Sequence, residues 1–145
     1  MLQAAAYCRV STDKEDQANS FEAQQRYFRE YIQRQPDWEL QGIYADEGIS
    51  GTSTHRRVEF NNMLRAAELG QIDLIVTQEV SRVARNTVDA LQITRDLRRR
   101  GIGVLFLNDG LDTRTNDGEL RLAIMSSVAQ DESRKTSERS KWGQT

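Results

Sequence analysis

The chain has 145 residues, of which 29% are charged and 37% hydrophobic, and its formal net charge is −2. This length fits one domain with a single core. Twenty basic against 22 acidic side chains argue against a broad surface that coats nucleic acid. Cys8 is the only cysteine, which excludes an intrachain disulfide, and together with the single His55 it makes a zinc site improbable. No apolar run approaches the ~20 residues of a membrane span, so we expect a cytoplasmic protein without membrane contact.

Apolar runs of strand character alternate with helical patterns along the chain. Strands are expected at residues 4–10, 38–46, 72–77 and 102–108, and helices at 21–34, 58–70, 87–100 and from 118 onward. Ser20 is the expected N-cap of the first helix, and Gly70 the expected C-cap of the second. This alternation predicts an α/β fold of three layers with a mainly parallel central sheet.

The last helical pattern differs from the others. Its distal half is too polar for a core, and a long amphipathic helix that projects from a small domain usually needs a partner such as its twin. We therefore expect an α/β core over residues 1–117 and the start of a long helix for dimerisation over residues 118–145.

Several polar segments are expected to meet at one edge of the sheet. Ser11, the loop at 47–56 and residues 78–86 each follow a predicted strand, and ligands of parallel sheets bind at the carboxyl ends of the strands. Tyr7, Arg9 and Ser11 share one side of the first strand because side chains alternate. A simpler interpretation stays open here: Arg9 could pair with Asp46 or Asp73, and Ser11 could merely start a turn.

Arginines follow the strands at the same edge. In "SRVAR", Arg82 and Arg85 are three residues apart and would face the same way on a helical turn, while Arg56 and Arg57 end the loop before the second helix. Guanidinium groups bind phosphate oxygens bidentately. A serine among arginines fits attack on a phosphodiester, with the arginines stabilising the charge that a metal ion stabilises elsewhere. We expect no metal and no cofactor.

Four segments carry a family resemblance: "AYCRVST", "YADEGISGTSTHRRVEFNNML", "DLIVTQEVSRVARN" and "SSVAQDESRKTSER". In their order and spacing they resemble the catalytic domain of the serine recombinases, the resolvase/invertase family, and the "DEGISG" loop is most similar to the large integrases and transposases. The resemblance implies that Ser11 attacks the scissile phosphate to form a 5′-phosphoserine link, followed by strand exchange and religation. It also implies double-stranded DNA as substrate and a homodimer that assembles into a synaptic tetramer.

The resemblance also assigns roles by position. It implies that the catalytic residues are Ser11, Arg9, Arg57, Arg82 and Arg85, with Arg56 as the alternative loop arginine. Supporting polar positions are Tyr7, Gln24, Asp46 and Asp73, and we expect the two aspartates to orient arginines. Positions on the long helix expected to lie near DNA are Arg134, Glu138, Arg139 and Lys141. Two positions depart from the family: Ser81 stands where aspartate is common, and Val58 where proline is expected.

Other functions were weighed against this one. A flavodoxin-like domain that holds a nucleotide phosphate would need glycines in the loop at 12–19, which has none. A silent relative that keeps only the dimerising helix is disfavoured by Ser11 and the arginines. Activation of Ser11 by His55 is less favoured than activation by its arginine neighbours. The recombination site, and the choice among integration, excision, inversion and transposition, stay open.

Overall fold

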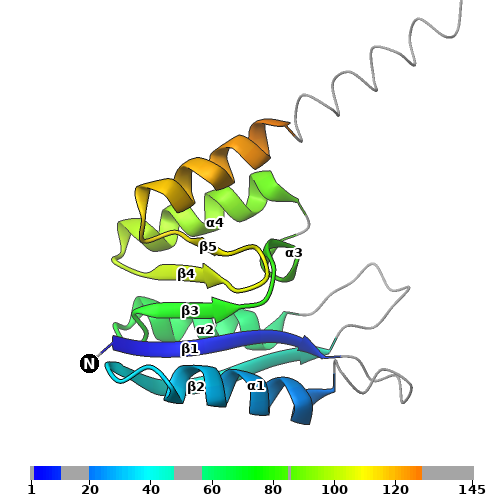
Figure 1. Ribbon diagram of the computed structural model, residues 1–145, viewed down its shortest axis with the longest axis vertical. Helices are drawn as coiled ribbons and strands as arrows, with labels where there is room; N and C mark the ends of the chain where they lie inside the picture. The colour runs from blue at the N-terminus through cyan, green and yellow to red at the C-terminus, as the bar shows by residue number, and fades with distance from the viewer. Residues whose placement is uncertain (1, 11–19, 48–56, 85, 129–145) are drawn as a thin grey trace, which may run out of the picture.

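The computed structural model describes residues 2–10, 20–47, 57–84 and 86–128. Its elements along the chain are β1 (Leu2–Val10), α1 (Phe21–Gln33), β2 (Trp38–Glu47), α2 (Val58–Glu68), β3 (Leu74–Thr77), α3 (Val80–Val83), α4 (Thr87–Arg99), β4 (Gly103–Phe106), β5 (Leu111–Asp112) and a helix over residues 116–128 (Figure 1). The sheet order is β2-β1-β3-β4-β5. The pairs β1–β2, β1–β3 and β3–β4 are parallel, and β4–β5 is antiparallel.

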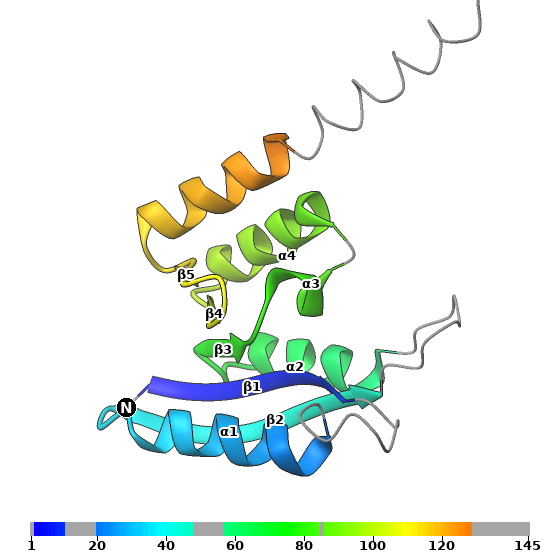
Figure 2. The same ribbon diagram turned by 45° about the vertical axis from the view of Figure 1, so that its right-hand side comes forward.

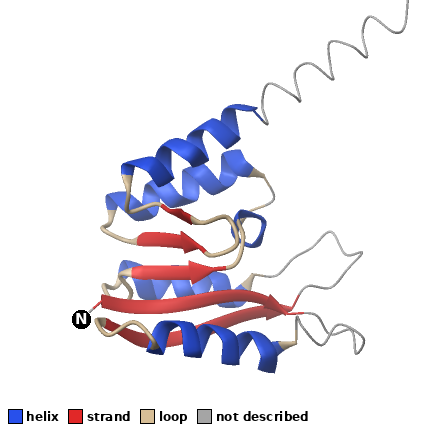
Figure 3. Ribbon diagram, viewed as in Figure 1, coloured by secondary structure: helices blue, strands red, loops and turns tan. Residues whose placement is uncertain are grey.

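Side-chain alternation along β1 separates two parts of the core. Ala5 and Tyr7 belong to the cluster that contains the buried side chains of α2 and α4. Cys8 belongs to the opposite cluster, with Phe28 and Ile32 of α1. Helices therefore cover both faces of the sheet (Figures 2 and 3), and the predicted three-layer α/β fold with a mainly parallel sheet is confirmed.

Local sequence signals explain where the helices begin and end. The Ser20 hydroxyl caps α1 by accepting from the Ala23 amide at 3.2 Å, as predicted. Gly70 follows α2 with a φ of 81°, a left-handed backbone conformation that glycine adopts without a steric penalty. Asn86, which carried no prediction, caps α4 by accepting from the Asp89 amide at 2.8 Å.

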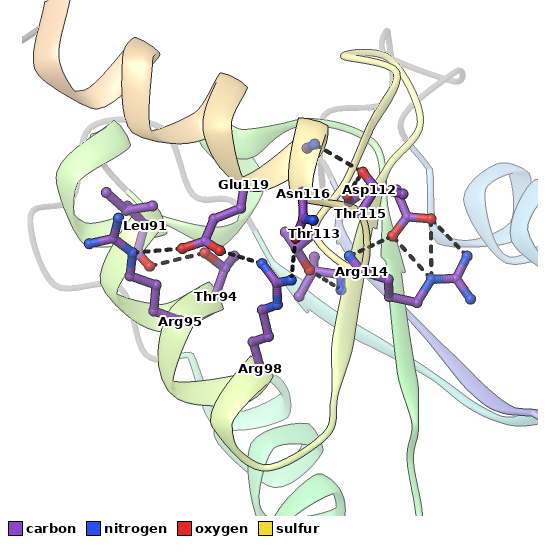
Figure 4. Close-up of polar contacts among 12 residues, drawn as sticks. Leu91, Thr94, Arg95, Arg98, Asp112, Thr113, Arg114, Thr115, Asn116 and Glu119 are labelled. Carbon is purple, nitrogen blue, oxygen red and sulfur yellow. Dashed lines mark hydrogen bonds and ion pairs between the residues drawn. The ribbon is translucent and has the colours of Figure 1, made fainter.

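The helix over residues 116–128 packs on α4, and it begins two residues earlier than expected. Leu122 is fully buried in the core cluster that also holds Leu97 of α4. Glu119 forms ion pairs with Arg95 and Arg98 of α4 (Figure 4). This part of the long helix is therefore attached to the body of the domain.

Two short elements have no counterpart among the strand and helix ranges expected from the sequence, although a helical turn was expected at Arg82. They are α3 and the antiparallel strand β5, with four and two residues. Elements of this length contain too few residues to show a hydrophobic period. Within the described ranges, no helix has the length and apolar character needed to cross a membrane.

Candidate active site

The carboxyl ends of β1, β2 and β3 lie on the same side of the molecule (Figure 1). Arg9, near the end of β1, is the register partner of Asp46, near the end of β2. Ser11 follows Val10, the last residue of β1, in the sequence. Several predicted residues lie outside the described part of the chain: Ser11, His55, Arg56, Arg85, Arg134, Glu138, Arg139 and Lys141.

Asp46 is the most connected polar residue at this edge. Its carboxylate is only 7% exposed and accepts three hydrogen bonds: from the Tyr7 hydroxyl at 2.9 Å, and from the Glu59 and Phe60 amides at 2.9 and 3.1 Å. The two amides belong to the first turn of α2, where backbone donors lack partners within the helix. Asp46 therefore fixes the start of α2 to the ends of β1 and β2.

Tyr7 keeps its proton in this environment. Burial raises the pKa of its hydroxyl to about 12, opposed by the nearby Arg57 guanidinium and assisted by Asp46. A neutral hydroxyl can donate to the Asp46 carboxylate, and a phenolate could not. Tyr7 is thus a structural donor within the site.

Arg57 lies at the N-cap of α2 and faces both Tyr7 and α3. Its guanidinium carbon lies 3.7 Å from the centroid of the Phe60 ring and 5.6 Å from that of Tyr7, within cation–π range. Its Nη2 donates to the backbone carbonyl of Arg82 at 3.2 Å. Arg57 therefore joins the start of α2 to α3.

Arg82 belongs to α3, which follows β3. Its Nε atom is buried and has no hydrogen-bond partner among the described residues. A buried donor without an acceptor is costly, and an anion could satisfy it. Burial raises the pKa of the Cys8 thiol, and the nearby Arg82 guanidinium opposes this rise.

The helical turn expected to carry Arg82 and Arg85 is described only as far as Ala84, because Arg85 lies outside the described residues. The helix α3 ends at Val83, and Ala84 has extended backbone angles, with φ −148° and ψ 161°. The shared orientation of Arg82 and Arg85 therefore stays a prediction.

Arg9 is half-buried, and its backbone carbonyl is anchored to α1. Gln24, a buried residue of α1, donates from Nε2 to this carbonyl at 2.7 Å. In the described part of the chain no ion pair involves Arg9, Arg57 or Arg82. The simpler interpretation, in which Arg9 pairs with Asp46 or Asp73, is not what the structure shows.

One family model covers nearly the whole chain. The family model described as "Resolvase, N terminal domain" matches residues 4–145. The chain belongs to the resolvase family. The transposon Tn3 resolvase of Escherichia coli is 34% identical over 101 residues, which are 70% of this chain and 52% of the relative. The chain thus spans about half the length of the curated relatives it matches.

Two solved structures of the same kind are similar to this resolvase-family chain. The N-terminal catalytic domain of TP901-1 integrase has a TM-score of 0.73 at 26% identity, over 91% of this chain and 97% of that one. A resolvase family site-specific recombinase from Streptococcus pneumoniae has a TM-score of 0.75 at 28% identity, over 99% and 95% of the two chains.

The expectation that two aspartates orient arginines needs correction within this resolvase-family site. Asp73 precedes β3 and accepts from the Gln3 amide at 3.0 Å, so it lies at the amino ends of β1 and β3, away from Arg82. Asp46 does lie at the site, but its oxygens bind Tyr7 and the start of α2 instead of a guanidinium. Asp46 acts on Arg57 through the position of α2.

Two residues that form contacts in this region carried no prediction from the sequence. Phe60 provides the ring against which Arg57 stacks, and the spacing of three residues on a helix could have indicated this contact. Asp109, on the turn after β4, accepts from the amide of Val80, the first residue of α3. No local pattern links residues 29 positions apart, so this contact needed the tertiary structure.

Proposed function

We infer that this chain is the catalytic domain of a site-specific DNA recombinase in which Ser11 is the nucleophile. The observation that carries this proposal is the set of three arginines, Arg9, Arg57 and Arg82, without a carboxylate partner in the described residues, at the edge where β1 leads into Ser11. Such an edge can bind a phosphodiester. Membership of the resolvase family supports the same function.

The proposed cleavage is a phosphoryl transfer. The Ser11 Oγ attacks the scissile phosphorus, and the bond between this phosphorus and the 3′ oxygen of the DNA breaks. The products are a 5′-phosphoserine and a free 3′-hydroxyl. The proton lost from Ser11 is balanced by the one gained on the 3′ oxygen. In religation a 3′-hydroxyl attacks the phosphoserine, and Ser11 leaves with a proton. The phosphoester bond is conserved, so no energy cofactor is required.

The arginines supply electrostatic stabilisation in this proposal. Negative charge builds on the phosphoryl oxygens in the transition state, and fixed guanidinium groups stabilise it without reorganisation. The buried Nε of Arg82 is one donor available to such an oxygen. Arg85, by the family resemblance, is a further candidate. Tyr7, Gln24 and Asp46 hold the elements that carry the arginines.

The proposed partners are double-stranded DNA and further copies of the chain. The helix over residues 116–128 exposes Leu120, Ile124 and Val128 at intervals of four residues, which makes one apolar stripe. A second copy could cover this stripe in a dimer, and two dimers would form the synaptic tetramer. DNA contacts along the distal helix are proposed for Arg134, Glu138, Arg139 and Lys141.

Trapping of covalent protein–DNA adducts tests the nucleophile. Full-length tagged protein is incubated with fragmented genomic DNA of its source organism, denatured in detergent and captured through the tag. The wild-type protein should hold DNA by 5′ ends, and Ser11→Ala should lower this adduct by at least about 1,000-fold, since the covalent route is lost with the nucleophile.

Ser81→Ala is the matched control, because the exposed Ser81 hydroxyl contacts only the Glu79 carboxylate among the described residues. This variant should form the adduct at nearly the wild-type level. Adduct formation by Ser11→Ala at the wild-type level would disprove the assignment of the nucleophile.

A further inference from the structure

The turn between β4 and β5, residues 107–110, lies against the segment that leads from β3 into α3. The Leu107 amide donates to the Thr77 carbonyl at 2.9 Å, and the Asn108 amide to the Gln78 carbonyl at 2.8 Å. The Asn108 side chain also donates to the Glu79 carboxylate at 3.2 Å. These contacts continue the pairing of β3 with β4 up to the start of α3.

Asp109 completes this series at the first residue of α3. Its Oδ2 accepts from the Val80 amide at 3.0 Å. Glu79, the N-cap residue of α3, makes no capping hydrogen bond with its own side chain. Val80 is buried and Asp109 is half-buried, so removal of the carboxylate would take away the hydrogen-bond partner of this amide. A carboxylate from another element therefore accepts from the first amide of α3, one of the backbone donors that lack a partner within the helix.

The position of Arg82 depends on the first turn of α3. This helix has four residues, and Arg82 is the third of them. The Arg82 amide donates to the Glu79 carbonyl at 3.0 Å, and the Ala84 amide to the Val80 carbonyl at 3.3 Å. Because α3 has so few internal hydrogen bonds, a shift of Val80 moves the whole helical turn and the Arg82 guanidinium with it.

The turn at residues 107–110 is also held by the helix over residues 116–128. Arg121 donates from Nη1 to the Gly110 carbonyl at 2.8 Å and from Nη2 to the Asp109 carbonyl at 3.0 Å. One guanidinium thus binds two consecutive backbone carbonyls of the turn. The residue that caps α3 is thereby held in place from the helix over residues 116–128.

We propose that Asp109 is a positioning residue for Arg82, and that Arg121 couples the seat of the long helix to this position. Asp109 acts through the Val80 amide and touches neither Ser11 nor the DNA phosphate in this proposal. The effect on cleavage rests on the proposed function, because Arg82 matters only if it stabilises the phosphoryl group. The effect on α3 itself does not depend on it.

The first test measures the rate of adduct formation at saturating DNA, with full-length protein and a DNA fragment recovered in the adduct assay. Asp109→Ala should slow the reaction about tenfold, equivalent to about 1.4 kcal/mol of barrier. Asp109→Asn keeps a side-chain oxygen that can accept from the Val80 amide, so it should react within about twofold of the wild-type rate.

Thr113→Val is the control for a merely structural effect. Thr113 lies after β5 on the same hairpin, and its hydroxyl accepts from the Val104 amide at 2.9 Å without contact to α3. This variant should lower the melting temperature while the rate at 20–25 °C stays near the wild-type value. A rate of Asp109→Ala equal to that of the wild type, or an equal loss in Asp109→Asn and Thr113→Val, would overturn the proposal.

A double-mutant cycle tests the role of Arg121. Arg121→Ala should slow cleavage, and the pair Asp109→Ala with Arg121→Ala should be no slower than Asp109→Ala alone, because both changes act through one turn. Arg99→Ala is the control, since Arg99 pairs with Asp96 within α4 and its ion pair involves neither the turn nor the helix over residues 116–128. Fully additive losses would show that Arg121 acts by another route.

A nuclear magnetic resonance measurement separates this proposal from the proposed function. In protein without DNA, Asp109→Ala should shift the Val80 amide and the Arg82 Nε–H resonances, while Asp109→Asn should leave the Arg82 signal near its wild-type position. If wild-type protein forms no Ser11-dependent adduct, the proposed function fails, and these resonances still decide the positioning role. An unchanged Arg82 signal in Asp109→Ala would refute it.

Discussion

Neighbouring residues of β1 place two titratable side chains in the two halves of the core. Tyr7 and Cys8 are both almost completely buried, on opposite faces of the sheet. Burial raises the pKa of the Cys8 thiol to about 12; the Arg82 guanidinium opposes this rise and the Asp46 carboxylate assists it. Both side chains therefore stay neutral at physiological pH.

We expect the buried Cys8 thiol to lower the stability of the fold in mild alkali. Its pKa is 9.0 in a model compound and about 12 in the fold, so the folded state keeps a proton that the unfolded state releases. The contribution of this thiol to the free energy of unfolding is fully present below pH 9. It declines as the pH rises toward 12, and about 1.4 kcal/mol of it is lost at pH 10. Urea unfolding at pH 8 and pH 10 measures it, with Cys8→Ala as the variant that lacks this decline. A constant difference in unfolding free energy between the two proteins would contradict the expectation.

At the scale of elements, the helix over residues 116–128 is attached to α4 by polar contacts and by the buried side chain of Leu122. Glu119 pairs with Arg95 and Arg98, and Arg98 also donates to the Asn116 side chain at 3.2 Å (Figure 4). The arginine run that ends α4 thus serves carboxylates of the protein itself, since Arg99 pairs with Asp96 and Arg100 with Glu68. Basic side chains at the C-terminus of a helix are also favourable for its dipole.

Removal of Glu119 should weaken this attachment in a salt-dependent way. Partly exposed ion pairs contribute a few tenths to about 1 kcal/mol each, so Glu119→Ala should lower the free energy of unfolding by about 1 kcal/mol at low ionic strength. The loss should shrink in 0.5 M salt, where surface charges are screened. Asp96→Ala is the control, because its pair with Arg99 lies within α4 and is highly exposed. A loss that does not change with salt would assign the effect to packing instead.

The sequence determined the long elements well and the polar contacts between them poorly. Hydrophobic periodicity located four strands and four helices, while α3 and β5 were too short to show a period. The arginine-rich edge followed from the parallel order of the strands. The same rule separates Asp73 from the site, because a residue that precedes a parallel strand lies at the opposite edge. The contacts of Asp46 with α2, and of Asp109 with α3, join segments that only the folded chain brings together.

At the scale of the whole molecule, the described chain has one feature that a single copy does not explain. Leu120, Ile124 and Val128 are 59%, 53% and 51% exposed on the helix over residues 116–128, while Leu122 of the same helix is buried against the domain. The helix is therefore apolar on two faces, one toward its own domain and one toward solvent. Contiguous exposed apolar side chains usually mark an interaction surface, and a symmetric dimer uses the same surface of both copies.

A charge in this stripe should prevent self-association. Full-length wild-type protein should show a concentration-dependent dimer in sedimentation equilibrium, and Ile124→Lys should shift it toward the monomer by at least about tenfold in Kd, since a buried unpaired charge costs more than 1.4 kcal/mol. Leu69→Lys is the matched control, because Leu69 is 70% exposed beside α2 and lies outside the stripe. Both variants should keep the wild-type melting temperature of the monomer, because both side chains are largely exposed in it. Dimers of Ile124→Lys with the wild-type Kd would show that another surface holds the two copies together.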